Sequence, residues 1–112
     1  MTPYIWQKTN LTEAVKDLNP NWHLQGKDDF TQTSTRIITD TRKIEQGDIF
    51  LAIKGDNFDG HDYVKTAKDK GAVLAIVSRA VESDLPQLVV TDTKLALGKL
   101  GAYRRDQHPN LK

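Results

Sequence analysis

Short apolar runs separated by polar, glycine-punctuated loops make up the middle of this chain. Residues 36–39 and 49–53 are rich in isoleucine and predict two strands. Between them we expect a turn in which Gly47 takes the positive φ that a tight reversal needs. Residues 72–77 are continuously apolar, as a parallel strand covered on both faces would be, and residues 88–90 predict a further strand.

A helix is predicted near the beginning of the chain. Asn10 is its expected N-cap, with Glu13 three residues later returning a hydrogen bond, and Asn19-Pro20 ends it. Residues 22–26 then alternate as a short strand does, and residues 27–29 form a polar loop. The apolar positions that recur at helical spacing are Leu11, Ala14, Val15 and Leu18.

Two more helices follow the central strands. The first is expected to begin at His61 or Asp62, to bury Tyr63, Val64 and Ala67, and to end at Gly71. Residues 78–87 then read as a surface connection. Asp92 stands where the cap of the last helix should be, and that helix runs to residue 105.

This order of strands and helices predicts an α/β fold. We expect a small single domain with a mixed or parallel sheet flanked by helices, because strand, helix, strand, helix is the order of such folds. A chain of 112 residues has room for one core. Residues 1–105 form the predicted domain, and residues 106–112, with Pro109 and Asn110, are the predicted connector to a further domain.

Charge and composition exclude several classes of protein. The net charge of +1, with 28% charged residues, gives no basic stripe, so nucleic acid is disfavoured as a partner. The absence of cysteine excludes disulfides and thiolate metal sites. No apolar stretch approaches bilayer length and the start of the sequence is unlike a signal peptide, so we expect a cytoplasmic protein with no membrane insertion.

One loop has the composition of a ligand-binding segment. Gly55 and Gly60 enclose two acidic residues, an amide and an aromatic side chain. A loop that only connects two elements has little use for this mixture, whereas a loop that grips a ligand does. The four residues between the glycines are Asp56, Asn57, Phe58 and Asp59.

Three motifs around this loop resemble a known family. They are Asp40-Thr41-Arg42, the segment 47–55 and the segment 59–63. In this order they are similar to the signature of the amino-terminal domain of the Mur ligases, the ATP-dependent enzymes that build the peptide stem of peptidoglycan. Residues 67, 71–72, 88–93 and 96–97 also match, so the resemblance extends from about residue 38 to residue 103, while the first thirty residues match only in layout.

Within the family, three segments resemble the ligases that add D-alanyl-D-alanine to UDP-N-acetylmuramoyl-tripeptide. They are residues 39–43, 58–63 and 85–88. The ligases that add diaminopimelate or lysine are the first alternative, although those relatives tend to carry His-Gln where this chain has Asp56-Asn57. The second alternative is a binding or interaction module that shares only the scaffold.

The resemblance implies that this domain holds the UDP end of the nucleotide substrate. Uracil offers two carbonyl acceptors and one N–H donor, which hydroxyl, amide and backbone groups can read while an aromatic face covers the ring. For Thr41 the alternative role is a turn hydroxyl, and for Phe58 it is a place in the core. The implied contacts are Thr39, Thr41, Asp56, Asn57 and Phe58.

Catalysis is expected to lie outside this chain. No Gly-x-x-x-x-Gly-Lys-Ser/Thr loop occurs in the 112 residues, and the resemblance implies that it begins a few residues beyond Lys112. No cofactor is therefore expected in this chain, while ATP and Mg²⁺ are implied for the full-length ligase. The implied partners are the central ATP-binding and C-terminal domains of that ligase, and the chain itself is expected to bind without catalysing.

Charged residues near the motifs have competing roles. Arg42 can clamp a diphosphate or pair with a neighbouring Asp, and both readings stay open. Structural roles are predicted for Asp40 and Asp48, which flank turns. His61 is predicted to be a capping or surface residue, and no metal-ligand spacing links it to the other histidines. Backbone conformation is the first explanation for the glycines at positions 55 and 60, and close approach of substrate is the second.

Overall fold

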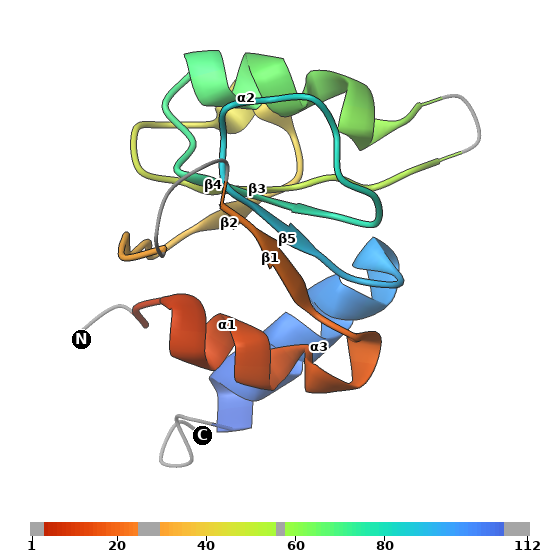
Figure 1. Cartoon of the computed structure of the whole chain (residues 1–112). Coiled ribbons are helices and arrows are strands. Elements are labelled where there is room, and N and C mark those ends of the chain that lie inside the picture. Colours follow the sequence, from red (N-terminus) through yellow and green to blue (C-terminus); the bar gives the residue numbers. More distant parts are fainter. Residues whose placement is uncertain (1–3, 25–29, 56–57, 107–112) are drawn as a thin grey trace.

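A five-stranded sheet organises the chain, with helices on both of its faces (Figure 1). The computed structural model describes residues 4–24, 30–55 and 58–106. In chain order the elements are α1 (Lys8–Ala14), the 3₁₀ turn η1 (Lys16–Leu18), β1 (Asn21–His23), β2 (Ile37–Ile38), η2 (Thr41–Lys43), β3 (Ile49–Leu51), η3 (Gly60–Tyr63), α2 (Val64–Asp69), β4 (Leu74–Val77), β5 (Gln87–Val89) and α3 (Thr93–Asp106).

The sheet is mixed, as the sequence predicted. Its strand order is β1-β5-β4-β3-β2. The four strands from β2 to β5 are parallel, and β1 pairs antiparallel with β5 at one edge. In the middle of the sheet, β4 is paired on both sides and buried along its whole length, which confirms the predicted parallel strand covered on both faces.

Alternation along β3 separates two cores. Ile49 and Leu51 pack into a core that includes residues of α1 and α3, while Phe50 and Ala52 pack into a core that includes residues of α2. Successive side chains of a strand point to opposite faces, so one short strand serves both layers. Figure 1 shows α1 and α3 on one side of the sheet and α2 on the other.

The connection between β2 and β3 differs from the prediction. These strands are parallel, with Ile37 opposite Ile49, so the tight reversal expected between them is wrong. The intervening residues contain η2, and this length allows the chain to return to the same end of the sheet before β3 begins. Gly47 does take a positive φ, of 90°, and donates its N–H to the carbonyl of Gly71 at 2.8 Å.

The predicted cap of α3 is confirmed, whereas the cap of α1 is a different residue from the one predicted. Asp92 accepts the N–H of Leu95 at 3.0 Å, which confirms it as the cap of α3. At α1 the N-cap is Gln7, and Asn10 stands three residues later and accepts the Gln7 N–H at 2.8 Å. The prediction that Asn10 is the N-cap is therefore wrong. Asn10 is the third residue of α1, and its side chain accepts one of the two hydrogen bonds of the capping box.

Two predictions about burial are corrected by the structure. Within residues 78–87, Leu85 and Gln87 are buried, and Gln87 belongs to β5. The Gln87 amide holds both backbone groups of Val81 at 2.8 Å, which folds this connection onto the sheet. Conversely, Tyr63 is 39% exposed, although Val64 and Ala67 are buried as predicted.

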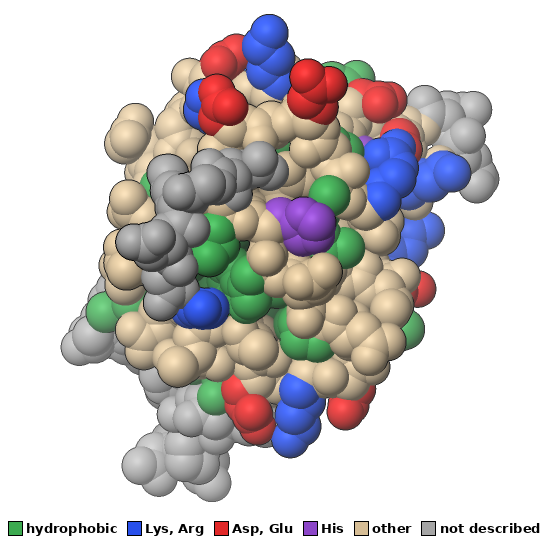
Figure 2. Space-filling model, in the orientation of Figure 1, with side chains coloured by type: hydrophobic (Ala, Val, Ile, Leu, Met, Phe, Trp, Pro, Cys, Tyr) green, Lys and Arg blue, Asp and Glu red, His purple; other side chains and the backbone are tan. Residues whose placement is uncertain are grey.

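The surface and the chain ends add little constraint on function. On the face drawn in Figure 2, Lys and Arg side chains are interspersed with Asp and Glu around the rim. None of the helices in the described ranges is long and apolar enough to cross a bilayer. The predicted connector begins at Asp106, which is the last residue of helix α3, and residues 107–112 lie outside the described residues. Residues 25–26 of the strand predicted over 22–26 also lie outside them.

Candidate functional site

A hollow lies beside the point where β2 ends. It has a volume of about 440 Å³ and we call it the strand-end pocket. It brings together four of the residues that the sequence predicted to bind a ligand, although they belong to two separate loops. Asp56 and Asn57, the other two, lie outside the described residues. The lining residues are Thr39, Asp40, Thr41, Arg42, Phe58 and Tyr63.

Other hollows of similar size exist on the molecule, so volume alone does not select this one. A hollow of about 400 Å³ lies near the beginning of β4, where Gly71, Ala72 and Val73 line it. Ligands of open α/β sheets bind outside the carboxyl ends of the parallel strands, and Thr39 directly follows the carboxyl end of β2. Position in the sheet therefore favours the strand-end pocket.

One wall of the pocket is formed by a bidentate ion pair between Asp40 and Arg42. Asp40 accepts the Arg42 Nε at 3.0 Å and its Nη2 at 2.9 Å, and it also caps η2 by accepting the Arg42 backbone N–H at 2.9 Å. The Arg42 side-chain hydrogen bond, followed by the backbone one, lowers the pKa of Asp40 from 3.8 to about 2. The predicted structural role of Asp40 is thus confirmed, while a contact of Arg42 with a diphosphate stays a prediction.

Two aromatic side chains form another wall of the pocket. The rings of Phe58 and Tyr63 stack with their centroids 5.3 Å apart and their planes 23° from parallel. Phe58 is 46% exposed, so the alternative that placed it in the core is wrong. Tyr63 was missed as a site residue because its helical spacing suggested burial. Its position four residues after Asp59, inside the third motif, is the signal that could have found it.

The loop that carries Phe58 is closed by backbone contacts. Gly55 donates its N–H to the Phe58 carbonyl at 2.6 Å, and Gly60 donates to the Ile53 carbonyl at 2.8 Å. A Cβ on Gly60 would lie 2.8 Å from the Ile53 nitrogen and 2.9 Å from the Ala52 Cα. Neither Gly55 nor Gly60 has a positive φ, so the prediction that backbone conformation explains these glycines is wrong. At Gly60 it is the close approach to its own strand end that requires glycine.

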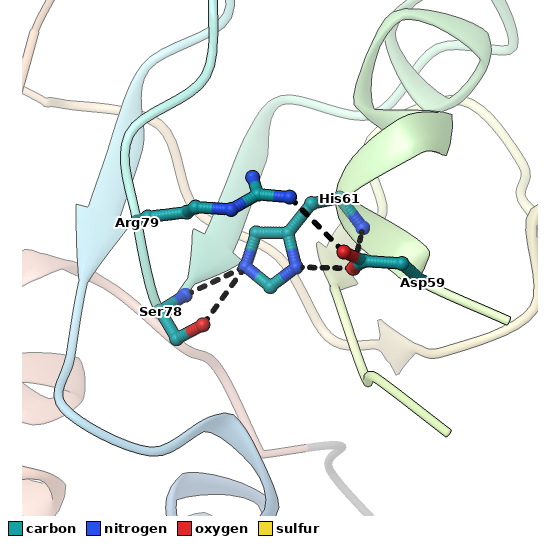
Figure 3. A network of polar contacts seen from close by, with 4 residues as sticks. All are labelled: Asp59, His61, Ser78 and Arg79. Carbon is teal, nitrogen blue, oxygen red and sulfur yellow. Dashed lines mark hydrogen bonds and ion pairs between the residues drawn. The ribbon is translucent and has the colours of Figure 1, made fainter. Parts of the chain in front are cut away.

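His61 occupies a different position from the one predicted. It is 5% exposed, and its Nδ1 lies 2.7 Å from Asp59 Oδ1 while its Nε2 lies 2.9 Å from the backbone nitrogen of Ser78 (Figure 3). The capping role belongs instead to Asp59, which accepts the His61 backbone N–H at 3.0 Å. This hydrogen bond, followed by the one from the His61 side chain, lowers the pKa of Asp59.

The Asp59, His61 and Ser78 side chains are arranged in the order of a hydrolase triad, yet the geometry opposes that chemistry. Ser78 Oγ lies 3.1 Å from Nε2, but the Ser78 backbone N–H already donates to the same nitrogen at 2.9 Å. A general base needs that lone pair for the hydroxyl proton, and an oxyanion hole commonly uses the nucleophile's own N–H. The network therefore holds structure together.

The described part of the chain contains no group of three or more His, Asp or Glu side chains placed to hold an ion. Asp48, one of the carboxylates considered, accepts the Glu45 N–H at 2.8 Å and lies 3.2 Å from the Arg36 Nε. Its predicted structural role is confirmed.

The fold and the strand-end pocket define an α/β domain with a hollow beside the carboxyl end of its edge strand β2. Comparison with known proteins assigns the family. Residues 33–110 match the model described as "Mur ligase family, catalytic domain". The chain belongs to the Mur ligase family, which confirms the resemblance found in the sequence.

Individual relatives show which members of the family the chain is similar to. The chain is 48% identical, over 80% of its length, to the UDP-N-acetylmuramoyl-tripeptide--D-alanyl-D-alanine ligase of Escherichia coli, of which it spans 19%. It is 41% identical, over 56% of its length, to the UDP-N-acetylmuramoyl-L-alanyl-D-glutamate--2,6-diaminopimelate ligase of Aquifex aeolicus, of which it spans 13%. A solved D-alanyl-D-alanyl ligase from Acinetobacter baumannii superimposes on the whole chain with a TM-score of 0.85 and 43% identity, and the chain covers 24% of it.

Proposed function

We propose that this domain binds the UDP end of UDP-N-acetylmuramoyl-tripeptide for an ATP-dependent ligase that adds D-alanyl-D-alanine in peptidoglycan precursor synthesis. The observation that carries this proposal is the strand-end pocket, which gathers Thr39, Thr41, Arg42 and Phe58 from two loops. The sequence predicts all four of these residues as ligand contacts. The greater coverage favours this branch of the family: the Escherichia coli D-alanyl-D-alanine-adding ligase matches 80% of the chain and the Aquifex aeolicus diaminopimelate-adding ligase 56%, and a solved D-alanyl-D-alanyl ligase matches the whole chain.

The chemistry of the pocket suits a uridine nucleotide. The stacked rings of Phe58 and Tyr63 offer an exposed aromatic wall on which a base can lie. The hydroxyls of Thr39 and Thr41 can both donate and accept hydrogen bonds, as the two carbonyls and one N–H of uracil require. Because Arg42 neutralises Asp40, the pocket does not present an uncompensated carboxylate to a diphosphate.

Catalysis is assigned to other parts of the whole ligase. There the terminal carboxylate of the tripeptide would be phosphorylated by ATP with release of ADP, and the amine of D-alanyl-D-alanine would then displace phosphate to form the peptide bond; Mg²⁺ would be held by those other parts. This domain contributes orientation, since binding energy from the remote nucleotide end helps to hold the distant carboxylate in place. Residues 1–105 act as the substrate-binding domain, the central and C-terminal domains are its partners, and the cytoplasm is where ATP and the nucleotide precursor meet.

The diaminopimelate-adding branch is the second candidate, since the Aquifex aeolicus relative supports it. The two candidates predict the same UDP pocket and differ in the length of the peptide on the substrate. Assaying the whole ligase with UDP-N-acetylmuramoyl-dipeptide and with the tripeptide separates them. Turnover of the tripeptide with D-alanyl-D-alanine supports the first candidate, and turnover of the dipeptide with diaminopimelate supports the second.

Nucleotide binding by the 112-residue chain can be tested directly. UDP and CDP are titrated in parallel by calorimetry, because the two ligands share the diphosphate and differ in the base edge. We expect UDP to bind more tightly than CDP, since uracil and cytosine present different donors and acceptors to the threonine hydroxyls. Equal binding of both, or no binding of UDP, would contradict the proposed function.

A further inference from the structure

The loop that carries Phe58 is held to the rest of the sheet by a side chain outside the pocket lining. Phe58 is followed directly by Asp59, whose Oδ1 accepts both the backbone N–H of His61 at 3.0 Å and the His61 Nδ1 at 2.7 Å. The second carboxylate oxygen accepts the Arg79 Nη2 at 3.0 Å. The loop thus ends in a carboxylate with three donors around it.

The geometry fixes the tautomer of His61. A backbone N–H can only donate, so the 2.9 Å contact from the Ser78 nitrogen requires Nε2 to be an unprotonated acceptor. Nδ1 then carries the hydrogen and donates it to Asp59. The His61 side chain is 2% exposed, so water does not readily replace either bond.

His61 therefore connects two parts of the chain that are distant in sequence. Asp59 ends the Phe58 loop, and Ser78 directly follows the carboxyl end of β4, as Figure 3 shows. Tyr63 lies on the same single turn, η3, as His61, and stacks on Phe58. Both rings of the aromatic wall are consequently attached to the segment that the imidazole secures.

We propose that His61 is a positioning residue for the nucleotide site, which holds the Phe58 loop and η3 against the end of β4 so that the aromatic wall is formed before the ligand arrives. The inference rests on the proposed function of the pocket. A site formed in advance loses less conformational entropy on binding, so loosening this connection weakens the ligand without removing any atom that touches it.

Two substitutions each keep one half of the connection. In His61→Asn the amide can reach Asp59 in place of Nδ1 but falls short of Ser78, and in His61→Gln the amide oxygen can reach Ser78 but the bond to Asp59 is lost. Ser78→Ala is the matched control, because it removes the Oγ that lies 3.1 Å from Nε2 and keeps the backbone N–H. UDP is titrated into each variant at a temperature where circular dichroism shows it fully folded.

We expect both His61 variants to bind UDP roughly threefold to tenfold more weakly than the wild type, as the loss of one buried hydrogen bond would predict. We also expect a weaker nuclear Overhauser contact between the Phe58 and Tyr63 rings. Ser78→Ala should keep wild-type affinity and ring contact. If His61 supplied only stability, its folded variants would keep the UDP affinity and the Phe58–Tyr63 ring contact of the wild type. That result would overturn the proposal.

Two further outcomes separate this inference from the proposed function. If the wild type does not bind UDP, the proposed function fails, and the ring contact alone then decides whether His61 positions the loop. If neither His61 variant folds, ¹⁵N spectra of the wild-type imidazole decide. A hydrogen on Nδ1 and a bare Nε2 support the proposal, whereas a hydrogen on Nε2 overturns it.

Discussion

The two faces of the sheet differ in the size of the side chains that pack against them. The face covered by α1 and α3 is packed with large side chains, among them Trp6, Leu11, Ile49 and Leu100. The face covered by α2 includes four alanines: Ala52, Ala67, Ala72 and Ala75. The buried His61 belongs to η3, the 3₁₀ turn directly before α2.

This difference separates stability from site geometry. Large apolar side chains remove the most surface from water, so the α1 and α3 face should dominate the free energy of unfolding. Small side chains bury less, and directional hydrogen bonds at Asp59, His61 and Ser78 place the loop beside the pocket instead. Substitutions on the two faces should therefore affect different measurements.

The largest effect is expected on the α1 and α3 face. Leu11 is fully buried in α1, so Leu11→Ala should lower the free energy of unfolding by about 2–5 kcal/mol through lost burial and a residual cavity. Urea unfolding measures this loss. UDP affinity of the folded variant should be unchanged, and a parallel fall in affinity would break the separation between the two faces.

An intermediate effect is expected where the loop meets β3. Gly60→Ala places a methyl group 2.8–3.0 Å from backbone atoms of Ala52 and Ile53, so it should cost roughly 1–3 kcal/mol of stability and displace the pocket loop. Thermal unfolding and UDP titration measure the two consequences. Gly98→Ala is the control, because nothing lies within 4 Å of the added Cβ and helix α3 should gain up to about 1 kcal/mol. A Gly60→Ala variant as stable as the wild type would refute the close approach.

Much of the fold could be predicted from the sequence, because apolar runs and caps report on local structure. Residues 49–53 and 72–77 contain β3 and β4, and Asp92 caps α3 as expected. The burial of His61 could not be predicted in this way. It depends on Ser78, seventeen residues further along the chain, and no local periodicity encodes which polar side chain a distant backbone N–H will meet.

The candidate site was predictable to a similar degree. The family resemblance implied Thr39, Thr41 and Phe58 as ligand contacts, and Arg42 was a candidate next to them in the sequence. The structure gathers all four in one pocket. Tyr63 was missed, since helical spacing placed it on the same face as Val64 and Ala67. It belongs to the 3₁₀ turn η3, whose different rotation per residue leaves its ring exposed beside Phe58.

A binding effect without a stability effect is expected at Phe58. Phe58→Ala should weaken UDP binding by about 1–3 kcal/mol through loss of base stacking, while the melting temperature stays nearly unchanged because the ring is 46% exposed. The same prediction applies to Asn57, through lost hydrogen bonding. Leu95→Ala, at a side chain 56% exposed on α3, is the control and should alter neither quantity. A large loss of stability with unaltered binding would show that Phe58 supports the fold.

A smaller effect distinguishes the two roles of Arg42. Arg42→Lys keeps the charge and loses the planar fork that now contacts Asp40. If Arg42 clamps the diphosphate, the variant should weaken UDP more than uridine, and the difference should shrink at high salt. Titrations of both ligands at two salt concentrations measure this. Equal weakening of uridine and UDP would remove Arg42 from the phosphate contacts.

The smallest effect concerns acid stability. The pKa of Asp40 is about 2 in the folded chain, below its ordinary value of 3.8, so its ionised form favours folding. This contribution is present above pH 3.8 and is lost as the pH falls towards about 2. Asp40→Asn should therefore lose less stability than the wild type across that interval. Identical unfolding curves at each pH would show that the exposed pair with Arg42 contributes nothing measurable.

The most direct test maps UDP onto the folded chain by protein-observed NMR. The proposed site predicts that the largest shifts fall on Thr39, Thr41, Phe58 and Tyr63, with smaller changes at His61 and Ser78, and that residues of α1 stay unchanged. Saturable shifts of this pattern would support the strand-end pocket as the nucleotide site. Shifts centred on the hollow near the beginning of β4, or no saturable shifts at all, would contradict it.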